Sequence, residues 1–373
     1  MCDMATVKEI IRVLEQYFPP YIAESWDNPG LQIGDEEAEV TKVVTALDIC
    51  GEVVEQAIAE KAELILTHHP LLFRPIKSLR AGRLPDDWIL RLIKAGISVY
   101  SAHTNLDSGE KGLNQYLSEQ VGLQNIRALN QTFVEKTLKL EVMVPETHAQ
   151  SLREALSAAG AGDVGKYADS FFMSSGESTF MPKEGTHPFC GEAGKQTRTK
   201  EEKLETVIWK KDVPEILQIL EKVHPYEEPA FSLLPLENVY RSYSLGRIGE
   251  LETPMLLKDW VQHLKQALGL THILAVGGEN TRISRAAVVS GAGIEFMRDA
   301  VSKGCQVLLT GDMKYHEAQA AQNLGLCVVD AGHQGTERIV SELLKGLLEQ
   351  EKQNRGWKFD IIKAEAPELI WCE

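Results

Sequence analysis

Short apolar runs alternate with amphipathic stretches along the first hundred residues of the chain. Apolar side chains recur at helical spacing in residues 7–18, after a capping box formed by Thr6 and Glu9 and before Pro19 and Pro20. The following pattern predicts strands at 40–47, 64–67 and 98–102 and helices at 52–62 and 87–94. Buried strands that alternate with helices are typical of a parallel sheet with helices on both faces.

The same rhythm returns near the C-terminus. It predicts strands at 286–290, 306–310 and 326–330. It also predicts three helices, of which one runs through Ala300, one begins at Lys314 and one spans 336–349. Residues 43–69 and 287–312 look like one duplicated unit, in which Lys61-Ala-Glu-Leu-Ile-Leu-Thr67 matches Lys303-Gly-Cys-Gln-Val-Leu-Leu-Thr310. We therefore expect one pseudo-symmetric α/β domain with a mixed or parallel sheet, built from residues 1–135 and 239–373.

The middle of the chain, residues 136–238, has a different pattern. It predicts strands at 138–144, 167–174, 205–209 and 230–234, with helices at 146–159 and 212–222. This βαββαβ order is the ferredoxin-like arrangement, so we expect an α+β domain inserted between the two α/β halves. Residues 174–200 are rich in Gly, Ser, Pro and Thr and predict a long loop.

Composition narrows the class of protein. The chain has 39 Lys and Arg against 54 Asp and Glu, a net charge of −15, which argues against binding nucleic acid or anionic membranes. The six cysteines show no CxxC spacing, so neither a zinc ribbon nor a disulfide scaffold is expected. Charged residues interrupt the N-terminal helix, and no run of about 18 apolar residues occurs. We expect a reduced, cytoplasmic protein.

Histidines and carboxylates follow three of the predicted strands. His68 and His69 come directly after the strand at 64–67, and Asp107 follows the next strand. His333 and Glu337 follow the matching strand of the second half, four residues apart and so on one face of a helix. Adjacent histidines also occur as an ordinary surface pair. Since open α/β sheets bind ligands at the carboxyl ends of their strands, we expect these five side chains to converge.

This set of side chains suits metal ions. Three imidazoles and two carboxylates without a thiolate favour divalent zinc, iron, manganese or cobalt. A bridging carboxylate would hold two such ions about 3.5 to 4 Å apart, as in hydrolytic two-metal sites. Five protein ligands for two ions leave open positions, which favours chemistry or ion exchange over a structural role.

Four motifs follow one another along the chain. They are Thr67-His-His-Pro70, His103-Thr-Asn-Leu-Asp107, Thr310-Gly-Asp-Met-Lys-Tyr-His316 and Asp330-Ala-Gly-His-Gln-Gly-Thr-Glu337. Together they resemble the NIF-three-like family, whose members are also described as homologues of a type-two GTP cyclohydrolase. The resemblance implies a toroidal homohexamer with a dinuclear metal centre in each subunit. It also implies that His69 and Asp107 hold one ion, that His68 and His333 hold the other, and that Glu337 bridges both.

The insert resembles that of the longer members of this family, which is similar to the PII and CutA trimeric regulators. By this resemblance residues 136–238 would form a lid over the opening of the ring. Within the insert, His224-Pro-Tyr-Glu-Glu-Pro229 is either a pocket-facing cluster or a rigid turn. We favour the turn, with Glu227 and Glu228 as solvated charges.

Two further histidines belong to the motifs. His316 follows the strand that matches the one before His68, so it is a candidate for substrate contact or proton transfer. His103 is more consistent with a hydrogen-bonding role next to the metal ligands than with a sixth ligand.

The sequence therefore favours a metal-dependent hydrolase that uses a metal-bridging hydroxide on a nucleotide or a related small molecule. Two alternatives stay open. The first is a metal-handling or iron-delivery protein without turnover. The second is a regulatory scaffold in which the PII-like insert senses a small ligand.

Overall fold

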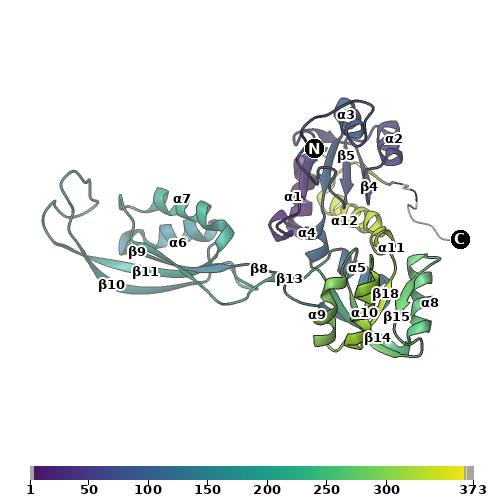
Figure 1. Ribbon diagram of the computed structural model, residues 1–373. Helices are drawn as coiled ribbons and strands as arrows, with labels where there is room; N and C mark the ends of the chain where they lie inside the picture. Colours follow the sequence, from purple (N-terminus) through teal and green to yellow (C-terminus); the bar gives the residue numbers. More distant parts are fainter. Residues whose placement is uncertain (1–3, 365–366, 368–373) are drawn as a thin grey trace. The chain divides into compact units, whose positions relative to one another are not determined.

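The computed structural model describes residues 4–364 and residue 367. The chain divides into two compact units, a core unit up to residue 132 and from residue 243 onward, and an insert unit of residues 133–242 (Figure 1). The chain leaves the core unit and re-enters it at neighbouring positions. The amide of Thr132 donates a hydrogen bond to the carbonyl of Tyr243 over 2.9 Å. The short strands β8 (Phe133–Val134) and β13 (Ser242–Tyr243) pair there.

The first sheet of the core unit has five strands in the order β19-β4-β5-β6-β2. The strands are β2 (Gly30–Ile33), β4 (Lys42–Ala46), β5 (Leu64–Thr67), β6 (Ser98–Ser101) and β19 (Asp360–Lys363). All pairs are parallel except β2 with β6. The short strands β1 (Ala5–Thr6) and β3 (Glu39–Val40) pair separately.

Helices cover both faces of this sheet. They are α1 (Val7–Tyr17), α2 (Gly51–Glu60), α3 (Asp86–Ala95) and α12 (Val340–Arg355). Successive strand residues point to opposite faces, so Leu64 and Leu66 pack with α1 and α12 while Ile65 packs with α2 and α3. The capping box of Thr6 and Glu9 is present at the start of α1.

The second sheet has six strands in the order β15-β18-β17-β16-β14-β7. The strands are β7 (Leu123–Ala128), β14 (Arg247–Leu256), β15 (Leu274–Val276), β16 (Arg282–Val288), β17 (Val307–Thr310) and β18 (Cys327–Asp330). The parallel pairs are β16 with β17 and β17 with β18, and the other neighbouring strands of this sheet pair antiparallel. The surrounding helices are α5 (Leu113–Gln120), α8 (Leu257–Leu268), α9 (Met297–Ser302) and α10 (Tyr315–Leu324).

The mixed α/β class predicted from the sequence is confirmed, but the prediction of a single sheet shared by both halves is wrong. Each half of the core unit forms a sheet of its own. The physical reason is that both faces of each sheet already bury apolar side chains against helices, and antiparallel strands such as β2 and β15 occupy outer positions. The predicted helix 336–349 is also two helices, α11 (His333–Glu337) and α12, which are separated at residues 338–339.

The insert unit has four antiparallel strands in the order β10-β11-β9-β12, the ferredoxin-like order predicted from the sequence. Its elements are β9 (Thr137–Pro145), α6 (Ala149–Ala158), β10 (Phe171–Phe180), β11 (Thr197–Trp209), α7 (Val213–Val223) and β12 (Phe231–Pro235). Side chains of α6 and α7, among them Leu152, Leu156 and Leu220, pack on one face of the sheet.

The predicted loop 174–200 is shorter in the structure, because both of its ends belong to strands. β10 and β11 pair from Phe171 with Thr206 to Phe180 with Thr197, which leaves only residues 181–196 between them. The end of this hairpin carries partly exposed side chains such as Ser178, Thr179 and Arg198, so its composition resembles that of a loop.

Among the helices of the described residues, none combines the length and the apolarity needed to cross a membrane.

Candidate metal centre

Three strand ends of the core unit bring the five candidate ligands together. His68 and His69 follow β5, Asp107 lies in the short helix α4 (Thr104–Ser108) after β6, and His333 and Glu337 lie in α11 after β18. The amides of His68 and His69 both donate to the carbonyl of Leu47, at 3.2 and 3.0 Å. Carboxyl strand ends from both sheets therefore meet at one cluster.

The carboxylate of Glu337 lies at the centre of the cluster and is buried. Its Oε2 atom is 3.0 Å from His69 Nε2 and 3.0 Å from His333 Nε2. Its Oε1 atom is 3.7 Å from His68 Nε2. One carboxylate thus faces three imidazoles, as a bridging ligand would.

His68 is the innermost imidazole and carries the strongest evidence for a missing ligand. Its Nε2 atom is fully buried, lies 3.7 Å from both Asp107 Oδ1 and Glu337 Oε1, and has no hydrogen-bond partner among the described residues. Atoms bound to one cation at about 2.0 to 2.2 Å lie roughly 3 to 3.5 Å apart. The distances in the cluster, 3.0 Å around Oε2 of Glu337 and 3.7 Å around His68, lie in or just above this range, and the donor types suit divalent cations.

The distances group the ligands differently from the family resemblance. His69 and His333 share Oε2 of Glu337, whereas His68 and Asp107 gather near Oε1. The resemblance implies that His69 pairs with Asp107 and His68 with His333. The distances place His68 near Asp107 and His69 near His333, with Glu337 close to both groups.

Each of these three imidazoles is held at its Nδ1 atom, which directs Nε2 toward the cluster. Asp48 Oδ1 lies 2.6 Å from Nδ1 of His69, and Asp312 Oδ2 lies 2.8 Å from Nδ1 of His333. Nδ1 of His68 is 2.8 Å from the carbonyl of Ala102. Such outer partners fix the tautomer and orientation of metal-binding histidines.

Asp48 is absent from the sequence-based candidates although a signal for it existed. It comes two residues after β4, just as Asp312 comes two residues after β17. The rule that places ligands at carboxyl strand ends applies equally to these positions.

His103 lies beside the cluster and forms a pair with Asp27. The His103 Nδ1 atom is 2.8 Å from Asp27 Oδ1, while Oδ2 of Asp27 accepts hydrogen bonds from the amide and the hydroxyl of Thr104. His68, His69 and His103 each offer a ring nitrogen within 4.8 Å of the others. The structure therefore places His103 next to the candidate ligands, and Asp27 is a further residue that sequence reasoning missed.

The charges of the cluster shift its ionisation. Burial opposes protonation of His69, but Asp48 and Glu337 outweigh it and raise the pKa of His69 to about 10. The carboxylate of Glu337 raises the pKa of His333 to about 9. Burial works against ionisation of Glu337 too, yet the three imidazoles hold its pKa well below the usual range. In the absence of a cation, protons on the imidazoles balance the negative charge of Glu337.

Metal uptake is therefore expected to release protons. At neutral pH His69 and His333 of the metal-free protein are cationic, since both pKa values are raised, and a metal ion binds only neutral imidazole. Burial opposes protonation of His68 too, but Asp107 and Glu337 raise its pKa as well. Loading with Zn²⁺ should therefore release at least about two protons, and the affinity should rise with pH up to roughly 9 to 10. Titration calorimetry in buffers of different ionisation enthalpy measures the release.

A His316→Ala variant is the control for proton release, because its cluster is intact and it should release the same number of protons. Zinc binding without any proton release would contradict the protonation of the metal-free cluster.

Two cavities adjoin residues that orient the cluster. One, of about 420 Å³, is lined by Trp26, Asp27 and Phe73, and the rings of Trp26 and Phe73 lie 6.0 and 6.4 Å from the ring of His103. The other, of about 670 Å³, is lined by Asp48 and Arg338 among others. Both have the size of small-molecule sites.

His316 does not join the cluster. It lies in the first turn of α10, is exposed, and has its ring 5.4 Å from that of the exposed Tyr315. Of the described residues, the histidine and carboxylate groups close enough to share an ion come from the segments around His68, His103 and His333. A role for His316 in substrate contact or proton transfer stays a prediction.

Comparison with known proteins gives matches over nearly the whole chain. Residues 5–368 match the family described as Duf34/NIF3 (NGG1p interacting factor 3). The chain is 37% identical over 359 residues to a protein of Halalkalibacterium halodurans named "GTP cyclohydrolase 1 type 2 homolog", covering 96% of both chains. A protein of Bacillus subtilis with the same name is 36% identical, with 92% of this chain and 91% of that protein covered.

A solved structure of a NIF3-related protein also matches the fold over nearly the whole chain. A Bacillus cereus protein described as related to NIF3 superposes with a TM-score of 0.85 at 35% identity, covering 99% of this chain and all of that one.

Proposed function

The chain belongs to the Duf34/NIF3 family, and from this membership and its cluster of ligands we propose that it is a dinuclear, metal-dependent hydrolase of the GTP cyclohydrolase type. The family resemblance of the four motifs is thereby confirmed. The observation that carries the proposal is the carboxylate of Glu337, which is shared between His68 on one side and His69 with His333 on the other. The substrate class is a nucleotide or a related small molecule.

Five residues would hold the ions: His68 and Asp107 on one side, His69 and His333 on the other, and Glu337 on both. Two bound divalent cations, zinc, iron, manganese or cobalt, would polarise an electrophile and lower the pKa of a water molecule. The protein fixes these ligands through Asp48, Asp312 and the carbonyl of Ala102, so little reorganisation is needed on loading.

His103 is the residue that we assign to proton transfer. Asp27 holds its Nδ1 atom, which leaves Nε2 as the nitrogen that can exchange a proton with a substrate beside the cluster. Burial opposes ionisation of Asp27, but His103 and Thr104 lower its pKa to about 2, so Asp27 stays anionic and orients the imidazole. The adjoining cavity, with Trp26 and Phe73 in its wall, suits a flat aromatic group such as a nucleobase.

The test is a screen of the metal-loaded protein against nucleotides, nucleosides and purine bases. We expect turnover that stops when a chelator removes the metal and that falls about a thousandfold or more in a Glu337→Gln variant, since metal catalysis contributes several kcal/mol. A Glu351→Gln variant, which alters a buried glutamate bonded to Tyr17 and Arg355, serves as a control outside the cluster. No turnover with any compound, together with rapid loss of metal to the chelator, would overturn the hydrolase proposal.

A metal-handling protein without turnover is the second candidate. The observation that favours it is the uneven burial of the cluster, because the side chain of His68 is fully buried while that of His333 is 36% exposed. The ion held by His69 and His333 would then exchange with solvent more readily. The chelator arm of the screen separates the two functions.

Two features rest on the family resemblance and are proposed on that basis, namely assembly into a toroidal homohexamer and a PII- or CutA-like regulatory role of the insert. A cytoplasmic location is proposed from the composition of the chain. Light scattering of the purified full chain measures the assembly directly.

A further inference from the structure

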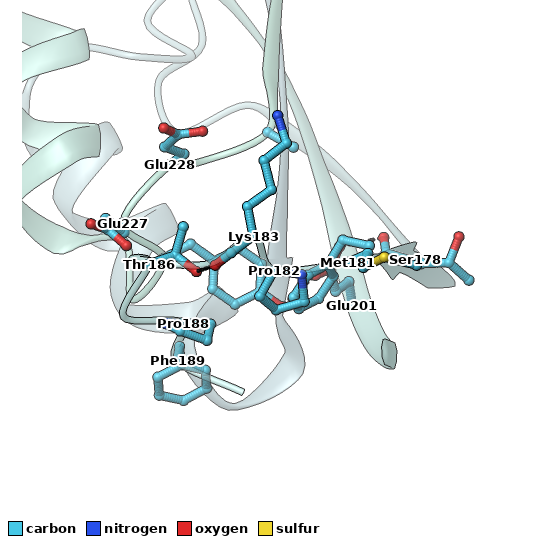
Figure 2. A pocket seen from close by; sticks show the side chains of 14 residues that line it. Ser178, Met181, Pro182, Lys183, Thr186, Pro188, Phe189, Glu201, Glu227 and Glu228 are labelled. Carbon is cyan, nitrogen blue, oxygen red and sulfur yellow. Dashed lines mark hydrogen bonds between the residues drawn. The ribbon is translucent and has the colours of Figure 1, made fainter. Parts of the chain in front are cut away.

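The insert unit contains a cavity of about 450 Å³, and all the residues that line it belong to this unit. Its walls come from the end of β10, the connection 181–196, the start of β11 and the turn after α7 (Figure 2). Cavities of this size bind small organic molecules.

One wall of the cavity is aromatic. The ring of Tyr226 lies between those of Phe180 and Phe189, with centroid distances of 5.8 and 6.1 Å. The turn that carries Tyr226 is fixed by the buried His224, whose Nε2 atom is 2.9 Å from the carbonyl of Met143 and whose Nδ1 accepts the amide of Tyr226 over 3.0 Å. The segment forms the turn favoured from the sequence, but the alternative of a pocket-facing cluster also holds, since Tyr226, Glu227 and Glu228 line the cavity.

A buried carboxylate also lines the cavity. Glu201 is 4% exposed, accepts a hydrogen bond from the phenol of Tyr226 over 2.6 Å, and accepts another from the hydroxyl of Ser178. Burial and the contact with Glu201 raise the pKa of Tyr226, so the phenol keeps its proton and donates it. Among the described residues, no Lys, Arg or His forms an ion pair with Glu201.

The rest of the cavity is also acidic. Glu227 and Glu228 line it, and the only cationic side chain in the lining is that of Lys183. Figure 2 shows the Lys183 side chain extending away from Glu201, and no ion pair of Lys183 occurs within the part of the chain that the structure describes. Two neutral hydroxyls thus hold a carboxylate whose charge lacks a cationic partner.

We propose that this cavity binds a small organic ammonium ion that carries an apolar or aromatic group. The ammonium would donate to Glu201, which gives a buried carboxylate a charged partner. The apolar group would pack against Phe180, Phe189 and Tyr226, whose ring faces attract cations and bury apolar surface. This inference is independent of the function proposed for the metal centre.

The test compares three ligands of similar shape on the full-length protein. The probes are phenethylammonium, the neutral 2-phenylethanol and the anionic 3-phenylpropionate, with binding followed by titration calorimetry. We expect phenethylammonium to bind at least about tenfold more tightly than the alcohol and the anion not to bind, since a hydrogen bond to a charged partner is worth that factor. Equal binding of the alcohol, or no saturable binding of the amine at millimolar concentration, would overturn the proposal.

Two matched pairs of variants locate the site. Glu201→Gln should weaken the amine at least about tenfold, whereas Glu202→Gln removes the same charge from the next residue, which is bonded to Ser175 and does not line the cavity. Phe189→Ala should lower the affinity for the amine about two- to tenfold. Its control is Phe172→Ala, which alters another exposed phenylalanine of the insert that lies outside the cavity lining.

These variants have a clear contrary outcome. If the amine binds Glu201→Gln and Phe189→Ala as tightly as it binds their controls, it occupies another site and the proposal is wrong. If Glu201→Gln does not fold, as judged by its melting temperature, the Phe189→Ala and Phe172→Ala pair decides.

Discussion

A Glu337→Gln variant is expected to purify with almost no metal, whereas the wild-type protein should hold about two divalent ions per chain. Both oxygens of this buried carboxylate face imidazole nitrogens, Oε2 at 3.0 Å from His69 and His333 and Oε1 at 3.7 Å from His68. The amide keeps the size of the side chain but has no charge and only one good ligand oxygen. Because both ions lose this ligand, we expect the affinity at each position to fall by more than about a hundredfold, beyond the loss usual for an outer partner.

Elemental analysis after dialysis against a metal buffer measures the effect. The matched control is Glu351→Gln, which alters another buried glutamate of the core unit, bonded to Tyr17 and Arg355 rather than to the cluster. A Glu337→Gln protein that retains both ions would show that this residue does not bridge them.

Adding a single methyl group at Gly291 is expected to abolish metal binding as well. Gly291 has a φ of +58°, and a Cβ atom there would lie 2.3 Å from Glu337 Oε1 and 3.2 Å from His333 Cε1. The contact of 2.3 Å is shorter than real Cβ atoms show, so the Gly291→Ala variant must displace the carboxylate of Glu337, and the tight contact of 3.2 Å also presses on His333. We expect metal content below one tenth of the wild-type value, about the loss seen when the support of a metal ligand is removed.

The backbone strain of this change has its own control. Gly325 has a similar φ of +67°, but a Cβ atom there would meet nothing within 4 Å. Both variants cost about 1 to 2 kcal/mol for placing alanine in the left-handed region, so Gly325→Ala shows the effect of the backbone strain without the contact to the cluster. If Gly291→Ala binds metal as tightly as Gly325→Ala does, close packing against Gly291 does not position the carboxylate.

The sequence predicts which residues meet but not all the details of how they meet. His68, Asp107 and Glu337 are far apart in the chain, yet each follows a parallel strand, and this position is sufficient to expect their convergence. The division into ion-binding groups depends on side-chain rotamers. It is the approach of Nε2 of His69 and of His333 to the same oxygen that indicates their pairing, and no spacing rule contains that information.

The errors in the fold prediction have a common origin in pairing between strands. Apolar runs identify β5 and β17 as buried strands, but the runs do not say whether the two belong to one sheet. Likewise, Ser178 and Thr199 are directly paired in the ladder of β10 and β11, although neither side chain has the apolar character that marks a strand in a sequence. Hydrogen bonds between strands form regardless of such composition.

The neighbouring exit and entry points of the insert have a consequence for how the core unit can fold. Thr132 and Tyr243 are hydrogen-bonded, so for the core unit the 110 residues between them amount to one closed loop. Closing a flexible loop of that length costs only about 2 kcal/mol more than closing one of ten residues. The core unit therefore tolerates the insert at a small entropic cost, and a short turn in its place would join two residues that already lie side by side.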